Sequence, residues 1–310
     1  MIRSILVLGA SGTLGAAITR YLCCQGYKVI GQYNKNTIEF ESINLTKLKA
    51  QTSEINILAL KPEVVINCIG CKTISPAMFA LNTVYPAELM ADCESAGVKK
   101  FIHISSVGSF GAGLNAGLVD ESYPLSPTNP YEVSKAAADK TILSAAKTNM
   151  DVLILMPSNV LTFNKANKDL GFLRLLVRFG VLISVKGRST VLNFVFDTHI
   201  AEYINDVVSS PVSIVGKRVL NTPIPIDFLV SSLREINRRI LLIRIAESRI
   251  VSLRQVLSAT YRVLPFSILE KLINKTHEID SDRVFLSADK FTSERFDSDR
   301  RRLDFVEYLK

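Results

Sequence analysis

The sequence predicts a doubly wound α/β fold, in which helices cover both faces of a parallel β-sheet. In the N-terminal half, short runs rich in β-branched residues alternate with longer amphipathic segments, which indicates alternating strands and helices. The apolar runs are continuous, as expected for strands that are buried on both faces. A glycine-rich loop also follows the first apolar run and opens a helix, an arrangement typical of this fold class.

These patterns place the elements along the chain. Strands are predicted at 5–8, 27–30, 64–67, 101–104 and 152–155, with helices at 14–22, about 76–95 and 131 to about 147 between them. After residue 212 we expect a short strand, a helix over about 227–239, a strand over 240–243 and a helix over about 249–274. Residues 1–160 are therefore expected to form the doubly wound domain. Residues 161–310 are expected to form a smaller α/β lobe, from which about 191–210 returns to the first domain.

Composition excludes several classes of protein. With 310 residues, 48% of them hydrophobic and 21% charged, the chain is too long for a small disulfide scaffold and too apolar for a disordered protein. Its five cysteines lie in apolar surroundings, which predicts reduced thiols in a cytoplasmic protein. We interpret the CxxC at 68–71 as incidental and expect no metal site, since no second CxxC or His pair accompanies it. We expect neither a secretion signal nor a membrane-spanning helix.

The loop at 9–15 has the glycine pattern GxxGxxG. Glycines permit a tight turn and let a pyrophosphate approach backbone N–H groups, while the helix that starts near Thr13 directs its positive end at the same anion. The strand before the loop and the helix after it are the context that this motif requires. The sequence therefore predicts a dinucleotide site, with contacts from Gly9, Ser11, Gly12, Thr13 and Leu14.

The end of the second strand bears on which dinucleotide binds. An acidic residue there would accept hydrogen bonds from the adenosine ribose and would repel a 2′-phosphate. This strand instead ends in Gly-Gln-Tyr-Asn-Lys at 31–35, with no acid before Glu39. Asn34 and Lys35 therefore favour NADP over NAD as the cofactor.

A second motif, YxxxK, combines Tyr131 and Lys135 at the start of a predicted helix. Residues four apart share one helix face, so we expect the Lys135 ammonium to lie beside the Tyr131 phenol. A neighbouring cation lowers the phenol pKa from about 10 and makes the group an acid/base near neutral pH. Upstream, Ser105 and Ser106 stand at the carboxyl end of the strand at 101–104, the edge where open α/β sheets bind ligands.

In this order and at these distances, the glycine loop, the serine pair and the YxxxK motif resemble the short-chain dehydrogenase/reductase superfamily. The stretches 9–15, 64–70, 82–106 and 120–135 are similar to its extended branch, the NAD-dependent epimerase/dehydratase family, which acts on nucleotide sugars. The resemblance implies a Rossmann domain with a smaller C-terminal substrate-binding lobe, a nucleotide-sugar substrate and an NAD(P) cofactor. We also expect a homodimer.

The resemblance implies roles for the matching residues of the first domain. Tyr131 would be the acid/base, and Lys135 would lower its pKa and hold the nicotinamide ribose. Ser106, rather than Ser105, would be the hydroxyl partner that contacts the substrate. Asn82 would help to place the lysine through a water molecule. The implied catalytic set is thus Ser106, Tyr131, Lys135 and Asn82.

Beyond this set, Pro157 would border the nicotinamide and Asn159 would face the substrate. The chain departs from the family pattern at Phe110, which replaces a Tyr, and at 161–164, which replaces a Gly-Pro-Gly turn. Thr-His at 198–199 replaces two Asp, and we expect His199 to be structural because the acid/base role is already filled. The full set of implied cofactor contacts is Gly9, Ser11, Gly12, Thr13, Leu14, Asn34, Lys35, Ile69, Gly70, Tyr131, Lys135 and Pro157.

The net charge of +8, from 37 Lys+Arg against 29 Asp+Glu, concentrates in the C-terminal third. We interpret the arginines within 234–262 as solvated faces of the lobe, because four of them recur every five residues and so walk around a helix. Peripheral contact of 234–262 with an anionic membrane is the alternative. We expect no nucleic-acid binding, since no recognition motif or aromatic platform accompanies the charge. The Arg run at 300–302 is interpreted as solvated.

Together these features predict an NAD(P)-dependent oxidoreductase or epimerase of a nucleoside-diphosphate sugar, with hydride transfer favoured at C4. Surface polysaccharide or nucleotide-sugar biosynthesis is the expected setting. Dehydration is disfavoured because Val107-Gly108 stand where dehydratases have Asp-Glu, and the NADP-like second strand favours a reductase. Two alternatives stay open: a reductase or dehydrogenase of a hydrophobic alcohol or ketone, and a non-catalytic NADP-binding scaffold or regulator. We expect a cytoplasmic protein, membrane-peripheral under the lipid-binding alternative.

Overall fold

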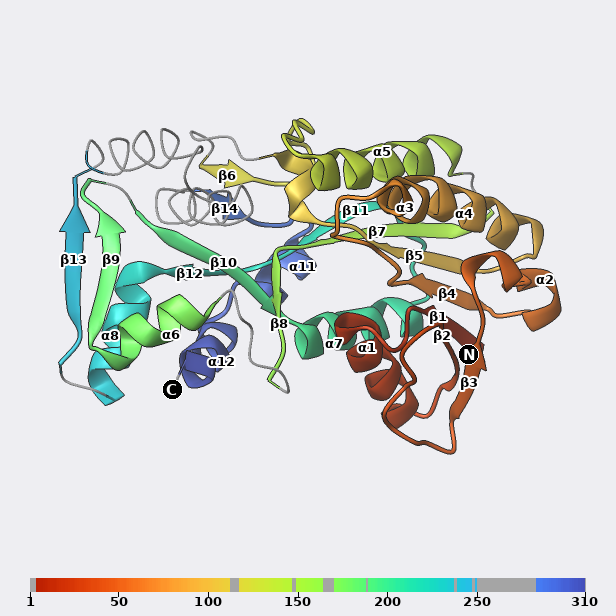
Figure 1. Ribbon diagram of the computed structural model, residues 1–310, viewed down its shortest axis with the longest axis horizontal. Coiled ribbons are helices and arrows are strands. Elements are labelled where there is room, and N and C mark those ends of the chain that lie inside the picture. The colour runs from red at the N-terminus through yellow and green to blue at the C-terminus, as the bar shows by residue number, and fades with distance from the viewer. Residues whose placement is uncertain are drawn as a thin grey trace.

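The computed structural model describes residues 4–111, 117–146, 149–163, 170–187, 189–236, 239–246, 249 and 283–309. Its central feature is a seven-stranded parallel sheet with the order β11-β7-β5-β4-β1-β2-β3 (Figure 1). The strands are β1 (Ser4–Leu8), β2 (Lys28–Tyr33), β3 (Leu45–Lys49), β4 (Val64–Asn67), β5 (Lys100–Ile104), β7 (Asp151–Pro157) and β11 (Val215–Leu220). The doubly wound α/β fold is confirmed, with all five strands predicted for the N-terminal half.

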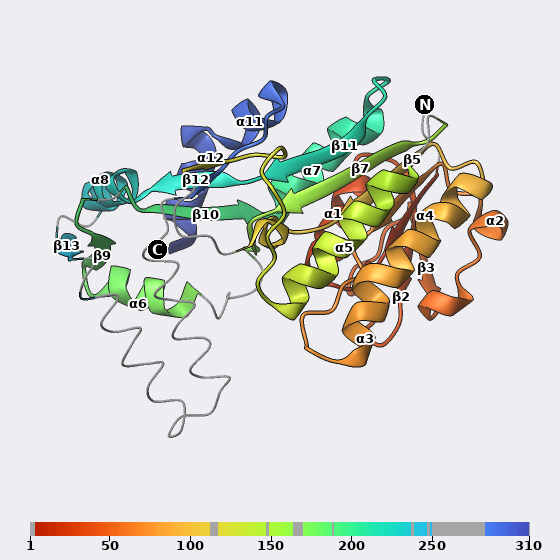
Figure 2. The same cartoon turned by 90° about the horizontal axis from the view of Figure 1, so that it is seen from above.

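Helices cover both faces of this sheet. They are α1 (Thr13–Cys24), α2 (Ile57–Leu60), α3 (Pro76–Phe79), α4 (Tyr85–Ser95), α5 (Pro130–Ala145) and α7 (Asp197–Ser209). In Figure 1, α4 and α5 lie above the sheet and α1 and α7 below it, and Figure 2 shows the α4–α5 layer from above.

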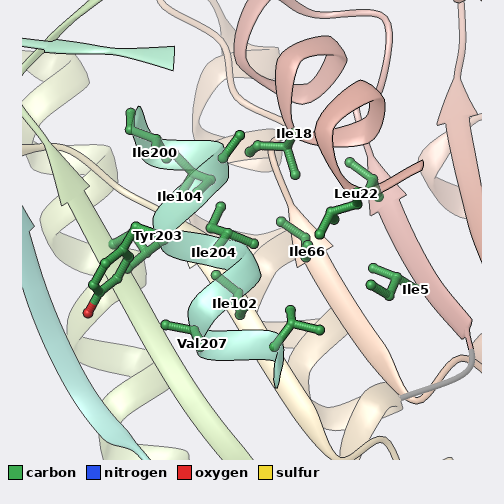
Figure 3. Packing of buried hydrophobic residues seen from close by; sticks show 14 of the residues in the cluster. Ile5, Ile18, Leu22, Ile66, Ile102, Ile104, Ile200, Tyr203, Ile204 and Val207 are labelled. Atoms are coloured by element: carbon green, nitrogen blue, oxygen red, sulfur yellow. The ribbon is translucent and has the colours of Figure 1, made fainter. Parts of the chain in front are cut away.

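The alternation of side chains along β1 explains the two layers. Ile5 and Val7 belong to one buried cluster with residues of α1 and α7, including Ile18 and Ile204 (Figure 3). Leu6 and Leu8 belong to the opposite cluster, with residues of α4 and α5. Because successive strand residues point to opposite faces, a continuous apolar run is what a strand between two helix layers requires.

Two elements differ from the sequence prediction. Strand β3 was not predicted, because its sequence LTKLK is partly exposed at the edge of the sheet and has no continuous apolar run. The helix expected over about 76–95 is α3 and α4 joined by a π-helical segment, Ala80–Val84. Pro86 follows this segment and has no N–H to give to the carbonyl four residues earlier, which is consistent with the irregular turn.

Smaller sheets and four helices make up the rest of the described chain. Strands β8 (Asn159–Leu161), β10 (Val191–Phe196) and β12 (Thr222–Pro225) form one sheet, β9 (Val181–Val185) pairs with β13 (Leu241–Ile245), and β6 (Leu118–Val119) pairs with β14 (Val284–Phe285). The helices are α6 (Gly171–Arg178), α8 (Ile226–Ile236), α11 (Lys290–Phe296) and α12 (Asp299–Leu309). The strand predicted after residue 212 corresponds to β11, the helix predicted over about 227–239 to α8, and the strand predicted over 240–243 to β13. The helix predicted from about 249 lies, apart from residue 249, outside the described residues.

The C-terminal half contributes to the central sheet as well as to its own core. Helix α7 packs on α1, and β11 pairs with β7 at the edge of the sheet. A third buried cluster combines α8 with Phe305, Val306 and Leu309 of α12. The division of the chain at residue 160 stays a prediction.

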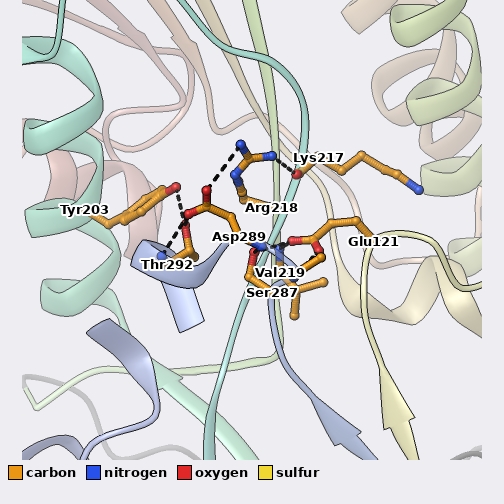
Figure 4. Close-up of polar contacts among 9 residues, drawn as sticks. Glu121, Tyr203, Lys217, Arg218, Val219, Ser287, Asp289 and Thr292 are labelled. Atoms are coloured by element: carbon orange, nitrogen blue, oxygen red, sulfur yellow. Dashed lines mark hydrogen bonds and ion pairs between the residues drawn. The ribbon is translucent and has the colours of Figure 1, made fainter. Parts of the chain in front are cut away.

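A cluster of polar side chains connects the segment before α11 to β11, at the edge of the central sheet (Figure 4). The Glu121 carboxylate accepts hydrogen bonds from the backbone N–H groups of Val219 (2.7 Å) and Ala288 (2.6 Å) and from the Ser287 hydroxyl (2.5 Å). Beside it, Asp289 caps α11 by accepting from the Thr292 N–H at 2.9 Å. One acidic side chain therefore joins β11 to the segment that leads into α11.

We had expected the Arg run at 300–302 to be solvated, but two of its three side chains form contacts within the protein. Arg300 is exposed, but Arg301 forms an ion pair with Glu202 of α7 at 2.6 Å, and Arg302 donates to the Pro223 carbonyl at 2.9 Å. These contacts hold α12 against α7 and β12. The run therefore has a structural role that its charge pattern did not indicate.

The arginines of 234–262 are described only in part. Arg234 donates to the Ile240 carbonyl at 3.0 Å, and Arg244 pairs with Asp227 at 3.2 Å. Arg238, Arg254 and Arg262 lie outside the described residues. Within the part of the chain that the structure describes, no helix is long and apolar enough to span a membrane.

Candidate active site

The glycine loop turns sharply between β1 and α1. Gly9 has a positive φ of 74°, and its carbonyl accepts a hydrogen bond from the Gly12 N–H at 2.9 Å. A Cβ on Gly15 would lie 2.2 Å from the Gly9 carbonyl oxygen, so the first turn of α1 packs directly on the loop. Gly12 and Thr13 are exposed at the helix start. The backbone thus has the shape of a cradle for an anion at a helix N-terminus.

The loop lies at the point where the strand order reverses. β1 has β2 on one side and β4 on the other, and the chain moves outward from β1 in both directions. A Cβ on Gly9 would approach the backbone of Cys68 and Ile69, just after β4, to 3.2 Å. In open α/β sheets, ligands bind at such a switch point, beyond the carboxyl ends of the strands.

Gln32 fixes the loop from the neighbouring strand, and the sequence did not single it out. The side chain is buried at the end of β2, where Oε1 accepts from the Gly9 N–H at 2.9 Å and Nε2 donates to the Ala50 carbonyl at 2.6 Å. Its amide therefore ties β1 and β2 to the end of β3. The sequence could have indicated Gln32, because a polar amide at the end of a strand that is expected to be buried needs hydrogen-bond partners. Beyond it, Asn34 and Lys35 are exposed.

Two asparagines shape the loop after β4, which contains Ile69 and Gly70. Asn67 Oδ1 accepts from the Ile69 N–H at 3.0 Å. Asn82, fully buried in the π-helical segment, accepts from the Cys71 N–H and donates to the Cys71 carbonyl, both at 2.8 Å, and also donates to the Ser134 hydroxyl at 2.9 Å. Asn82 therefore links this loop directly to α5, one residue before Lys135.

Ser106 and Tyr131 meet at the carboxyl edge of the sheet. Ser106 caps the short 3₁₀ turn Val107–Phe110, with Oγ accepting from the Gly108 N–H at 3.1 Å. Tyr131 stands in the first turn of α5, whose N-cap Asn129 accepts from the Glu132 N–H at 2.9 Å. Burial raises the pKa of Tyr131, and a side-chain hydrogen bond with Ser106 lowers it by a smaller amount. The proposed acid/base and its hydroxyl partner are thus brought together.

Lys135 is directed differently from our expectation. Its Nζ is buried, donates to the Ile104 carbonyl at 2.6 Å and lies 3.5 Å from His103 Nε2. Burial lowers the pKa of Lys135 to about 8. We expected this ammonium to lower the pKa of Tyr131, yet that pKa is raised, with burial as the main cause. The ammonium is held at the end of β5 by the Ile104 carbonyl.

His103 is a further buried residue of this site that the sequence did not indicate. Asn67 Oδ1 accepts from the Ile69 N–H, and the Asn67 amide nitrogen lies 3.2 Å from His103 Nδ1. Burial and the nearby Lys135 charge hold the pKa of His103 well below its ordinary value. A neutral imidazole therefore faces the Lys135 amine.

The remaining predicted residues lie on other elements. Pro157 is buried at the end of β7, and Asn159 is exposed in β8, with its Nδ2 donating to the Asn193 carbonyl at 3.2 Å. His199 lies in the first turn of α7 and faces Asp304 of α12, with 2.9 Å between Nε2 and Oδ2. All five cysteines are free thiols.

Comparison with known proteins relates the sequence to one family. Residues 5–178 match the model of the NAD dependent epimerase/dehydratase family. A UDP-glucose 4-epimerase of Mycolicibacterium smegmatis is 25% identical over 173 residues, 50% of this chain and 55% of that protein. Sterol demethylase protein B of Methylococcus capsulatus is 26% identical over 167 residues, 50% of this chain and 51% of that protein. The chain thus spans about half the length of the curated relatives it matches.

A solved structure shows the same fold over nearly the whole chain. MoeE5 in complex with UDP-glucuronic acid and NAD superimposes with a TM-score of 0.64 and 17% identity, covering 98% of each chain. At this identity the likeness concerns the fold. Because the family model covers more than half of the sequence, the chain belongs to the NAD dependent epimerase/dehydratase family.

Proposed function

We propose that the protein is an NAD(P)-dependent oxidoreductase or epimerase of a nucleoside-diphosphate sugar, with a reductase favoured. The observation that carries this proposal is the placement of Ser106 in the turn after β5 and of Tyr131 in the first turn of α5, at the carboxyl edge of the sheet and one helical turn from the buried Lys135. A family relative acts on UDP-glucose by its name, and MoeE5 holds a UDP-sugar beside NAD.

The residues present fit a dinucleotide. Gly15 lets the start of α1 pack directly on the loop, since a Cβ there would lie 2.2 Å from the Gly9 carbonyl oxygen. Gly9, Ser11, Gly12, Thr13 and Leu14, at this helix N-terminus, would hold the pyrophosphate. Lys135 would hold the nicotinamide ribose, and Ile69, Gly70 and Pro157 would border the cofactor. When bound, the nicotinamide supplies or accepts a hydride at the sugar carbon, C4 in our proposal.

Tyr131 exchanges the proton that accompanies hydride transfer. Because its pKa is raised, the phenol is protonated at neutral pH and is ready to donate to the oxygen of a ketone as that oxygen becomes an alkoxide. Ser106 donates a hydrogen bond to the same oxygen, which stabilises the developing charge. Asn159 is proposed to face the sugar. A group poised to donate favours reduction of a carbonyl.

We further propose NADP as the preferred cofactor. Asn34 and Lys35 are exposed beyond β2, and no acidic side chain precedes Glu39 to repel a 2′-phosphate. Michaelis constants for NADPH and NADH measured with the same substrate test this point. A clear preference for NADH would overturn it, and would match MoeE5, which is described with NAD.

The substrate class is tested by thermal unfolding in the presence of NADPH or NADH. UDP-glucose, UDP-galactose, UDP-glucuronic acid and a dTDP-sugar are each added, and a true ligand raises Tm by mass action. We expect at least one nucleotide sugar to add to the shift from the dinucleotide alone. UDP alone serves as the control, since it contains the nucleotide without the reacting sugar.

A hydrophobic alcohol or ketone is the second candidate substrate. It is favoured by the similarity to sterol demethylase protein B. The chain matches that protein at 26% identity over 167 residues and the sugar epimerase at 25% identity over 173 residues. In the same unfolding assay, a shift with a sterol or phenolic ketone but with no nucleotide sugar would replace our first choice.

Two finer proposals concern assembly and surface contact. We propose a homodimer, to be tested by light scattering coupled to size-exclusion chromatography. We keep membrane contact through 234–262 as the less favoured interpretation, since Arg234 and Arg244 already have partners within the protein. Co-sedimentation with anionic vesicles at low salt tests it, and absence of binding would remove it.

A further inference from the structure

A buried carboxylate lies one helical turn beyond Lys135. Tyr131, Lys135 and Asp139 are spaced by four residues on α5 and so share one face of the helix. Asp139 is fully buried, and its Oδ2 accepts from the hydroxyls of Ser105 at 2.7 Å and Ser109 at 3.1 Å. These two serines flank Ser106, so Asp139 connects the turn that carries Ser106 to the helix that carries Tyr131 and Lys135.

We propose that Asp139 is a positioning residue that fixes the Ser106 turn on α5 and supplies the negative charge that keeps Lys135 protonated. The proposal rests on the roles assigned above to Ser106, Tyr131 and Lys135. It adds a residue that touches neither of the proposed ligands and acts through those that do.

The need for a charge is what distinguishes Asp139 from an ordinary structural residue. An asparagine could accept the same two hydroxyl hydrogen bonds through its amide oxygen at no cost of ionisation. A buried carboxylate, by contrast, is expensive unless it is paired. Within the described residues, Asp139 Oδ1 has no hydrogen-bond partner. The two serine hydrogen bonds therefore do not by themselves require a negative charge at this position. Lys135 is the cation on the same helix face.

The charges around this pair are consistent with that assignment. Burial raises the pKa of Asp139 to about 6, while the Ser105 hydrogen bond and then Lys135, Ser109 and, from β11, Lys217 lower it, so the group is ionised at neutral pH. Asp139 in turn raises the pKa of Lys135 against the effect of burial. Burial raises the pKa of Cys68, after β4, to about 12, so this group is a neutral thiol that supplies no charge to Lys135.

On its other sides Lys135 meets groups that do not supply a negative charge. His103 from β5 is neutral and presents its Nε2 to the amine, and the Ile104 carbonyl accepts from Nζ. Tyr131, on the same helix, has its pKa raised by burial and, to a smaller extent, by Asp139, and is likewise neutral at pH 7. Among the described residues that face Lys135, Asp139 is thus the anion.

The test separates the charge from the hydrogen bonds. Asp139→Asn removes the carboxylate and keeps an acceptor for both serines, whereas the Ser105→Ala/Ser109→Ala double variant removes both hydrogen bonds and keeps the carboxyl group. Asp92→Asn, on the exposed side of α4, is the control for losing a carboxylate elsewhere. Lysines labelled with ¹³C at Cε report the titration of Lys135 by NMR, with its signal assigned by loss in Lys135→Arg.

We expect Asp139→Asn to move the titration midpoint of Lys135 down by about one pH unit or more, as for loss of an opposite charge nearby. Asp92→Asn should leave that midpoint within about 0.3 units, and the double variant should lower it by less than Asp139→Asn does, because the carboxylate remains although its pKa rises without the serine hydrogen bonds. The amide hydrogen-exchange rates of residues 105–111 should respond to the hydrogen bonds instead. They should be about tenfold faster in the double variant and within about twofold of the parent protein in Asp139→Asn. An unmoved Lys135 midpoint in Asp139→Asn, or unchanged exchange in the double variant, would overturn the proposal.

Asp139→Glu keeps the proposal testable if Asp139→Asn does not fold. The longer acid retains the charge, so the Lys135 midpoint should stay near that of the parent protein while the displaced turn exchanges faster. A fall of the midpoint as large as that expected for the asparagine would contradict the proposal. Neither measurement requires a substrate or cofactor, so their outcome is independent of whether the protein proves to be a nucleotide-sugar enzyme.

Discussion

The backbone N–H of Gly9 donates a 2.9 Å hydrogen bond to Oε1 of Gln32, a buried side chain on the neighbouring strand. The same amide donates through Nε2 to the Ala50 carbonyl at 2.6 Å. The shape of the proposed pyrophosphate loop is therefore set by a residue 23 positions later in the chain as well as by its own glycines. This residue stands just before the strand tip that we propose to select the dinucleotide.

Gln32→Leu should lower both stability and cofactor affinity. Leucine would leave the Gly9 N–H and the Ala50 carbonyl without their partner, which we expect to lower the free energy of unfolding by about 2–4 kcal/mol. Urea unfolding measures the first effect, and fluorescence titration with NADPH and NADH measures the second. Gln25→Leu, at the exposed end of α1, should cost less than about 0.5 kcal/mol. Equal effects of the two substitutions would show that the Gln32 contacts are unimportant.

Gly15→Ala should disrupt the glycine loop by direct contact. The new Cβ would lie 2.2 Å from the Gly9 carbonyl oxygen, so α1 would have to move away from the loop. We expect a loss of about 1–3 kcal/mol in stability and at least about a tenfold loss in dinucleotide affinity. Gly117→Ala is the matched control, because a Cβ there meets nothing within 4 Å. Parental affinity in Gly15→Ala would mean that the loop does not hold the cofactor.

Tyr131→Phe should separate catalysis from binding. The ring keeps its packing, but the proton donor is lost, so turnover should fall by about 10²–10⁴-fold. The dissociation constant for the dinucleotide should stay within about threefold, since the phenol is proposed to act on the substrate. Steady-state kinetics and equilibrium titration on one preparation check both statements. A non-catalytic scaffold would show no turnover to lose in the parent protein.

His199 predicts how stability depends on pH. Burial and the nearby Arg301 lower its pKa from 6.5 to about 3 in the folded chain, where the neutral ring hydrogen-bonds Asp304. As the pH falls from 6.5 towards 3, His199 binds a proton in the unfolded chain but not in the folded chain. The contribution of neutral His199 to the free energy of unfolding is therefore fully present above pH 6.5 and is lost on acidification. The loss approaches about 1.4 kcal/mol per pH unit.

The measurement compares the parent protein with His199→Gln, which keeps a side-chain nitrogen to donate to Asp304 but does not titrate. Urea unfolding at several pH values between 7.5 and 4 should show a shallower decline for the variant. Some decline should remain, because His103 is also buried and neutral. Identical slopes would show that His199 keeps an ordinary pKa in the folded protein.

Local patterns in the sequence were sufficient for the doubly wound fold. Continuous apolar runs mark strands that are covered on both faces, and those at 5–8 and 64–67 became neighbouring strands of the sheet. The residues of the GxxGxxG loop, and those of the YxxxK motif, are close together in the sequence, so their spacing alone predicts their local backbone geometry. Strand β3 was missed because a partly exposed edge strand carries no such run.

Tertiary structure decided how distant residues act on these motifs. Lys135 shares a helix face with Tyr131, yet its ammonium is held by the Ile104 carbonyl, and Asp139 bonds the two serines on either side of Ser106. Arg301 pairs with Glu202, although its neighbours in sequence suggested a solvated run. Periodicity fixes which face a residue occupies. Its partners, and with them its pKa, depend on which other segments pack against that face, and spacing along one chain does not contain that information.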